Sequence, residues 1–236
     1  MEEQIDGSER LQLTYPPNYA MLPRWSPDGK KIVFYVSLPD NSSRIYEVSR
    51  EGGTPRQLMP DDSNPPVSDC PGHCSQGDPN WSPDGSKIDH GFNNAASAIL
   101  LLDLATQKVT TLPGSPGLFS PRWSPNGRYV VALRSDSSAL LLFDFETQKW
   151  TDLSKGNRLG WPNWSKDGQY IYFTSGGPRV LRIRISDRKA ETVADLTTFR
   201  TTGRWFISLS LAPDDSPLLL RDATTSDIYS LDWEEP

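Results

Sequence analysis

Arg24-Trp25-Ser26-Pro27-Asp28-Gly29 is the first of four hexapeptides that share one pattern, a tryptophan followed by a polar turn. The other three are Asn80-Trp81-Ser82-Pro83-Asp84-Gly85, Arg122-Trp123-Ser124-Pro125-Asn126-Gly127 and Asn163-Trp164-Ser165-Lys166-Asp167-Gly168. A degraded fifth copy, Ser210-Leu211-Ala212-Pro213-Asp214-Asp215, has leucine in place of tryptophan. Positions 25, 81, 123, 164 and 211 are therefore 56, 42, 41 and 47 residues apart. A period of this size is typical of the four-stranded blades of a β-propeller.

The tetrad Ser-Pro-Asp-Gly has the chemistry of a hairpin corner. Proline fixes φ at its position, and glycine accepts a left-handed φ that costs other residues energy. An alternative would make the repeated aspartates metal ligands or acids. Because the third copy has Asn126, which serves a turn as well as aspartate does, the variation favours the turn. Each tryptophan is then expected to be the apolar wedge of its blade.

Short runs rich in β-branched and aromatic residues follow the motifs, at 31–36, 129–133, 170–173 and 217–220, and the copy after Trp81 is the poorest. Each is followed by a second run, a polar corner and a third run. With the strand that carries the tryptophan, each unit has four strands. We therefore predict an all-β propeller of antiparallel blades, forming one domain over residues 1–236.

The two ends of the chain hold incomplete units. Residues 9–14 resemble an outer strand without a blade, and the last unit stops at Pro236 before its outer strand. Unpaired strand edges invite aggregation, so joining the two ends removes both liabilities. We predict five blades, closed by the N-terminal strand 9–14 completing the C-terminal blade, and a monomer if the ring closes. The alternative is a piece of a larger ring.

The repeated tryptophan motif resembles the WD-like repeats of the TolB β-propeller family, over roughly residues 9–233. Similar repeats occur in the C-terminal propeller domains of bacterial regulators and kinases, and in the propellers of prolyl-oligopeptidase-type peptidases and some polysaccharide lyases. The resemblance implies a fold rather than one activity. It also implies a bacterial protein in the periplasm or another extracytoplasmic compartment, although no signal peptide is seen in this chain.

Composition excludes several classes of function. A net charge of −6 argues against a nucleic-acid-binding face. Apolar runs such as 98–102 are far too short for a membrane-spanning helix. The chain has neither a Gly-x-Ser-x-Gly pentad nor a phosphate-binding loop, and its two histidines are His73 and His90. We therefore expect no catalytic residue, no cofactor, no metal and no enzymatic activity.

An insertion at 60–78 lengthens the first repeat and contains both cysteines, Cys70 and Cys74, with His73 between them. Three ligands fall one short of a zinc site, and the spacing matches no common zinc or haem motif. A disulfide between Cys70 and Cys74 and two free thiols both remain open.

A partner is expected where the units differ at equivalent positions. The segments that lead into the first strand of each unit carry aromatic and arginine side chains, a composition favoured at binding hot spots. The candidate partner-binding face consists of Met21, Arg24, Asn80, Phe119, Arg122, Trp161, Asn163, Arg204 and Trp205. Alternatively, these aromatic residues pack between blades and the arginines bond to loop carbonyls.

The sequence therefore predicts a non-catalytic scaffold for protein–protein interaction or sensing, with an acidic or aromatic peptide as the partner. The alternative is an accessory or gating propeller of a peptidase or polysaccharide-degrading enzyme.

Overall fold

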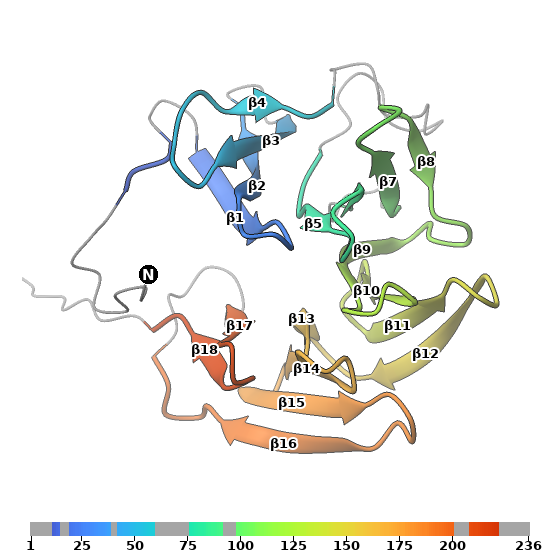
Figure 1. The fold of residues 1–236 in the computed structure, drawn as a ribbon. Helices are drawn as coiled ribbons and strands as arrows, with labels where there is room; N and C mark the ends of the chain where they lie inside the picture. Colours follow the sequence, from blue (N-terminus) through green and yellow to red (C-terminus); the bar gives the residue numbers. More distant parts are fainter. Residues whose placement is uncertain are drawn as a thin grey trace, which may run out of the picture.

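A computed structural model describes residues 11–14, 19–38, 42–59, 76–91, 98–200 and 208–221. In these ranges the strands form four four-stranded sheets and one two-stranded sheet, and neighbouring strands within each sheet are antiparallel. The sheets are arranged as blades around a common centre (Figure 1). No helix capable of crossing a bilayer occurs in these ranges.

Every complete blade is a simple meander in which consecutive strands pair. The first blade contains β1 (Tyr19–Trp25), β2 (Lys31–Ser37), β3 (Ser43–Ser49) and β4 (Arg56–Gln57). The second contains β5 (Asn80–Trp81), β6 (Lys87–His90), β7 (Leu100–Asp103) and β8 (Val109–Thr111). The third contains β9 (Leu118–Trp123), β10 (Tyr129–Arg134), β11 (Ala139–Asp144) and β12 (Lys149–Lys155). The fourth contains β13 (Gly160–Trp164), β14 (Tyr170–Ser175), β15 (Arg179–Arg184) and β16 (Ala190–Asp195).

The first strand of each blade lies nearest the centre of the ring and the last strand lies at the outside (Figure 1). The remaining strands, β17 (Leu209–Leu211) and β18 (Pro217–Leu219), form the two-stranded sheet beside the fourth blade. The ring thus places the starts of β1, β5, β9 and β13 around one axis.

The tryptophan motif forms the corner between the first two strands of each complete blade, as predicted. In the first blade, Ser26 Oγ donates to Asp28 Oδ1 (2.7 Å) and accepts from the backbone N–H of Lys31 (2.9 Å). Gly29 closes the turn with φ +66°. In the third blade Asn126 Oδ1 takes the place of the aspartate oxygen and accepts from Ser124 Oγ at 2.7 Å. The repeated acidic residue is therefore a turn residue.

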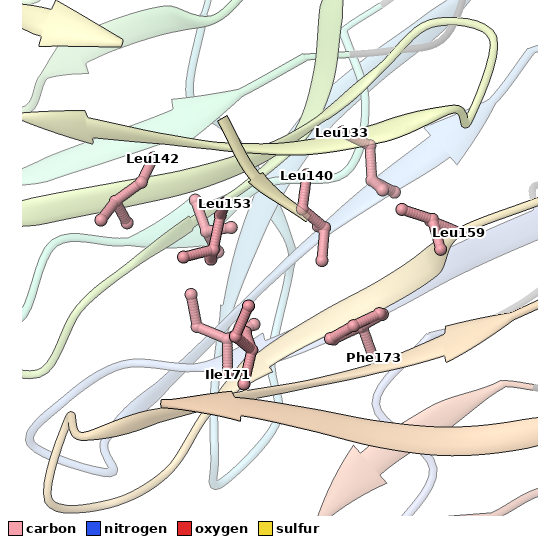
Figure 2. Packing of buried hydrophobic residues seen from close by; sticks show 9 residues of the cluster. Leu133, Leu140, Leu142, Leu153, Leu159, Ile171 and Phe173 are labelled. Atoms are coloured by element: carbon pink, nitrogen blue, oxygen red, sulfur yellow. The ribbon is translucent and has the colours of Figure 1, made fainter. Parts of the chain in front are cut away.

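Apolar side chains fill the spaces between neighbouring blades rather than one central core. Between the third and fourth blades, Leu133, Leu140, Leu142 and Leu153 face Leu159, Ile171 and Phe173 (Figure 2). The strands alternate residues between their two faces, so Val131 and Leu133 belong to this layer while Val130 and Ala132 face the second blade. Each complete blade is thus apolar on both faces.

The motif tryptophans also link one blade to the blade before it. The indole Nε1 of Trp81 donates to the carbonyl of Arg24 (3.2 Å), and that of Trp164 donates to the carbonyl of Arg122 (2.9 Å). Trp25 begins the series and is 57% exposed, against 7% for Trp81. The exposure of this wedge follows from its place at the open side of the described ring.

The described residues correct the predicted blade count, because they form four complete blades and not five. Residues 11–14 of the predicted strand 9–14 are not in a strand. Leu13 packs against Ile32 and Phe34, on the face of the first blade turned away from the second. The 228–231 segment, which should receive the N-terminal strand, lies outside the described residues. Closure of the ring is therefore not confirmed.

Candidate functional site

A similar backbone irregularity lies within the first strand of the first, third and fourth blades and just before the first strand of the second. Non-glycine residues with positive φ lie three positions before each motif tryptophan: Leu22 (48°), Asp78 (49°), Ser120 (56°) and Trp161 (53°). The strand register shifts at this point in the first, third and fourth blades. We call these four residues the bulge ring. A bulge inserts an extra residue and turns its side chain away from the regular alternation of the strand.

The bulge ring combines one backbone geometry with four unrelated side chains. A left-handed φ is uncommon outside glycine, asparagine and aspartate, and for a bulky residue it costs about 1–3 kcal/mol. Leu22 and Trp161 are bulky residues that adopt this conformation. The repetition of the bulge belongs to the fold, whereas its side chains differ: Asp78 and Ser120 are buried, and Leu22 and Trp161 are partly buried against apolar layers.

A buried ion pair connects the bulge of the second blade to the third blade. Arg122 Nη2 donates to Asp78 Oδ1 at 2.8 Å, and the two residues are 4% and 7% exposed. Arg122 Nη1 also donates to the carbonyl of Pro121 (2.7 Å). Because both charges are out of water, removing either one would leave the other unpaired in the interior.

Two further ionisable residues lie on strands next to β5, close in the fold to this pair. Asp89 of β6 is fully buried, and neither of its carboxylate oxygens has a hydrogen-bond partner. Arg24 of β1 is partly buried, and its Nε has no partner. We call Arg24, Asp78, Asp89 and Arg122 the axial cluster. These residues come from the first three blades and lie on or next to the innermost strands.

Burial is the main cause of the pKa shifts of Asp89 and Arg24. It raises the pKa of Asp89 well above that of an ordinary carboxyl group, although the nearby Arg122 opposes the shift. Burial and the charge of Arg122 lower the pKa of Arg24 to about 10, against the opposing effect of Asp78 and Asp89. The charges that act on Asp89 and on Arg24 are those of the other members of the axial cluster.

His90 follows Asp89 in β6 and is also buried, at 1% exposure. Burial lowers its pKa to about 4, so the imidazole is neutral near pH 7. A neutral histidine with that pKa is poorly suited to shuttle protons at physiological pH. In the described part of the chain, no three His, Cys, Asp or Glu residues gather as a metal site would require.

Most residues of the predicted partner-binding face have structural contacts. Met21, Phe119 and Trp161 are partly buried and pack against the apolar layers between blades. Asn163 Nδ2 donates to the carbonyls of Trp161 (2.8 Å) and Leu209 (3.0 Å), and thereby links the fourth blade to β17. Asn80 is partly buried in β5.

The arginines of that face differ in their surroundings. Arg122 is buried in the ion pair, whereas Arg24 keeps partial contact with solvent. Arg204, Trp205, Cys70 and Cys74 lie outside the described residues.

Sequence reasoning missed Asp78 and Asp89 as site residues. The residue before the motif tryptophan pairs with a residue of the second strand in each blade. From the first blade to the fourth, that partner is Val33, Asp89, Val131 and Tyr172. Asp89 is thus a carboxylate at a position that is apolar or aromatic in the other blades. This break in the repeat was the signal that could have identified it.

Comparisons with known proteins agree with this architecture. A family model described as the TolB beta propeller domain matches residues 76–232, more than half of the chain. TolB from Acinetobacter baumannii superposes with a TM-score of 0.63 at 19% sequence identity, covering 84% of this chain and 49% of that protein. A protein of Agrobacterium tumefaciens assigned to TolB gives a TM-score of 0.63 at 24% identity, covering 81% and 66%. At these identities the structural likeness shows the fold alone.

A sequence match to a protein with an enzymatic name is much shorter. The chain is 38% identical over 66 residues to an uncharacterised peptidase of Bacillus subtilis (strain 168), YuxL. The match covers 28% of this chain and 8% of YuxL. The chain therefore corresponds to about half of the Acinetobacter protein and to a small part of YuxL.

Proposed function

The chain belongs to the TolB β-propeller family, and from this premise we propose that it is a non-catalytic module that binds a protein partner. We further propose that the partner docks on the face where the inner strands begin. The observation that carries this proposal is the exposed Tyr19 at the start of β1, on the same strand as the bulge residue Leu22.

Binding is favoured over catalysis by the chemistry of this face. The described residues at the starts of the inner strands are mainly aromatic, apolar or arginine, which are the residue types enriched at protein interfaces. Tyr19 at the start of β1 is 77% exposed and belongs to no apolar layer of the described ring. An exposed tyrosine beside partly buried Met21 and Leu22 is a suitable anchor for a partner side chain.

The likeness to TolB structures supports placing the protein outside the cytoplasm, in the periplasm or at the cell envelope. We propose that it is a monomer there, with a peptide segment of an envelope protein as its partner. Neither a membrane span nor a nucleic acid is part of the proposal.

The match to YuxL favours a second candidate, an accessory propeller that controls access to a peptidase. Propellers of that kind act with a catalytic domain that carries a nucleophile, and this chain contains no Gly-x-Ser-x-Gly pentad. The second candidate predicts that peptide turnover depends on a catalytic partner.

Site-specific photo-crosslinking tests the proposed face. The photoreactive amino acid p-benzoylphenylalanine would replace Tyr19 on the proposed face and, as a matched control, Lys149 at the exposed start of the outer strand β12. We expect a protein from envelope extract to crosslink at position 19 and not at 149. The purified partner should bind with saturation, and Tyr19→Ala should weaken it about tenfold while Lys149→Ala leaves it unchanged.

Two results would contradict the proposal. Equal crosslinking at both positions would show that the inner-strand face has no special role. Peptide or oligosaccharide turnover by the purified chain alone would assign it a catalytic function.

A further inference from the structure

The polar atoms that the fold leaves unsatisfied are concentrated around the second blade. In the described ranges, the buried side-chain N and O atoms without a hydrogen-bond partner belong to Arg24, Gln76, Asp89, His90, Arg122 and Trp123. Native proteins satisfy the large majority of such atoms, so a cluster of exceptions requires an explanation. The second blade differs from its neighbours in the same region, because it places Asp89 where the first and third blades have valine.

The unsatisfied atoms are mostly donors. Arg24 Nε, Arg122 Nε, Gln76 Nε2 and Trp123 Nε1 are all N–H groups. Asp89 is also a donor when it carries a proton, a state that burial favours. Within the axial cluster, the unsatisfied arginine atoms Arg24 Nε and Arg122 Nε are both donors, so a group that supplies acceptor oxygens is their complement.

The net charge of the axial cluster indicates which kind of ligand fits it. With Asp89 protonated, Arg24 and Arg122 exceed Asp78 by one positive charge. A monoanion neutralises this excess, whereas a dianion such as phosphate would place an uncompensated negative charge beside Asp78. A cation would meet two arginines. Arginine also presents its N–H groups in a fork that matches the two oxygens of a carboxylate.

Access is provided by Arg24. Of the four side chains in the axial cluster, this one belongs to a residue that keeps partial contact with solvent, while Asp78, Asp89 and Arg122 are buried. Arg24 is therefore the member of the axial cluster that solvent reaches.

We propose that the axial cluster binds one carboxylate group of the partner protein, with Arg24 and Arg122 as donors and the buried Asp89 beside them. This inference rests on the proposed function, because it names a chemical group of the proposed protein partner; Arg24 and Arg122 lie near the ends of β1 and β9, farther along the inner strands than Tyr19. The carboxylate comes from an acidic side chain or from a chain end, and both present the same two oxygens.

The arrangement makes binding depend on pH. The groups that act on Asp89 are Arg122, Asp78 and Arg24, and its neighbour His90 is neutral near pH 7. A bound carboxylate favours the protonated form of Asp89, so binding is coupled to proton uptake. Affinity falls as the pH rises through the pKa of Asp89. Asp89→Asn, which imitates the protonated acid, binds the carboxylate without this dependence.

Small probes test the inference without the partner. The full ¹⁵N-labelled chain would be titrated with N-acetylglycine for a chain end, the α-amide of N-acetylglutamate for a side chain, and N-acetylglycinamide as the uncharged control. Tryptophan indole N–H signals report binding, because Trp81 donates to the carbonyl of Arg24. We expect saturable shifts with at least one carboxylate and none with the amide, and the responding probe identifies the source.

Matched variants give the result its specificity. Arg24→Gln should lower the affinity for the carboxylate probe at least tenfold. Arg50→Gln, an exposed arginine of the same blade that pairs with Glu51 at the surface, should leave the affinity unchanged. Equal binding by Arg24→Gln and the parent chain, equal shifts with the amide, or no shifts at all would overturn the inference. If the carboxylates fail while the partner still binds through Tyr19, the proposed function stands and the carboxylate site falls.

Discussion

Arg122 in the third blade and Asp78, just before the first strand of the second, form a buried ion pair of 2.8 Å. The pair fastens two blades together near the axis, in addition to the apolar layer between them. Its two members are 44 residues apart in sequence, so the contact depends on the assembled ring.

We expect Asp78→Asn to lower the free energy of unfolding by about 3–5 kcal/mol, because it leaves the Arg122 charge buried and unpaired. Asparagine tolerates the positive φ at this position, so the backbone is not the cause of the loss. The double variant Asp78→Asn with Arg122→Met should recover most of it. Urea unfolding measures all three, and Asp152→Ala, which breaks a surface pair with Lys155, should change stability by less than about 1 kcal/mol.

Trp25 and Trp81 occupy the same position in successive blades but differ in exposure, at 57% and 7%. Trp81→Ala should cost about 3–5 kcal/mol through the cavity it leaves. Trp25→Ala should cost less than about 1 kcal/mol, because that indole is already largely solvated. Denaturant-induced unfolding of the two variants measures both losses of stability. A loss at Trp25 equal to that at Trp81 would show that another part of the chain covers the first blade in solution.

His90 should weaken the fold in mild acid. Its pKa is about 4 in the folded protein and about 6.5 in an unfolded chain, so between these values the unfolded state binds more protons. Stability therefore falls as the pH drops through this window, by about 2 kcal/mol from pH 7 to pH 5. His90→Leu should remove this part of the loss in urea unfolding at the two pH values. An unchanged pH dependence in the variant would contradict the burial of a neutral imidazole.

Asp89 is expected to lower the stability of the fold, because its carboxyl group is buried without a hydrogen-bond partner. Asp89→Val introduces the residue found at the equivalent position in the first and third blades, Val33 and Val131. We expect the variant to gain about 1–3 kcal/mol, because an unsatisfied buried carboxyl group is removed. The reverse substitution, Val33→Asp, should be strongly destabilising. A loss of stability in Asp89→Val would instead assign Asp89 a structural role.

The repeated hexapeptide was sufficient to predict the blades, because proline, aspartate and glycine each act locally in the turn. Asn126 shows this directly, since it repeats the hydrogen bonds of the aspartates. The blade count was wrong for the described residues, because a count needs the chain ends and the fifth motif has neither tryptophan nor glycine at the key positions. There, Asp215 adopts a φ of +65°.

The site was harder to predict than the fold, because burial at the axis depends on pairing between strands. Arg122 was expected on the partner-binding face and is instead held in the interior by Asp78. The pairing of Asp89 with Asn80, which determines its place on the inner sheet, comes from strand register rather than from the composition around it. Met21, Phe119 and Trp161 could not be assigned from sequence, because packing and recognition favour the same residue types.

Each indole hydrogen bond runs from a later blade to an earlier one. Trp81 and Trp164 each donate to a carbonyl that was added to the chain earlier, 57 and 42 residues before them. During synthesis every such donor therefore leaves the ribosome after its acceptor. A nascent chain can dock each new blade onto a finished predecessor, so the order of translation is also an order of assembly.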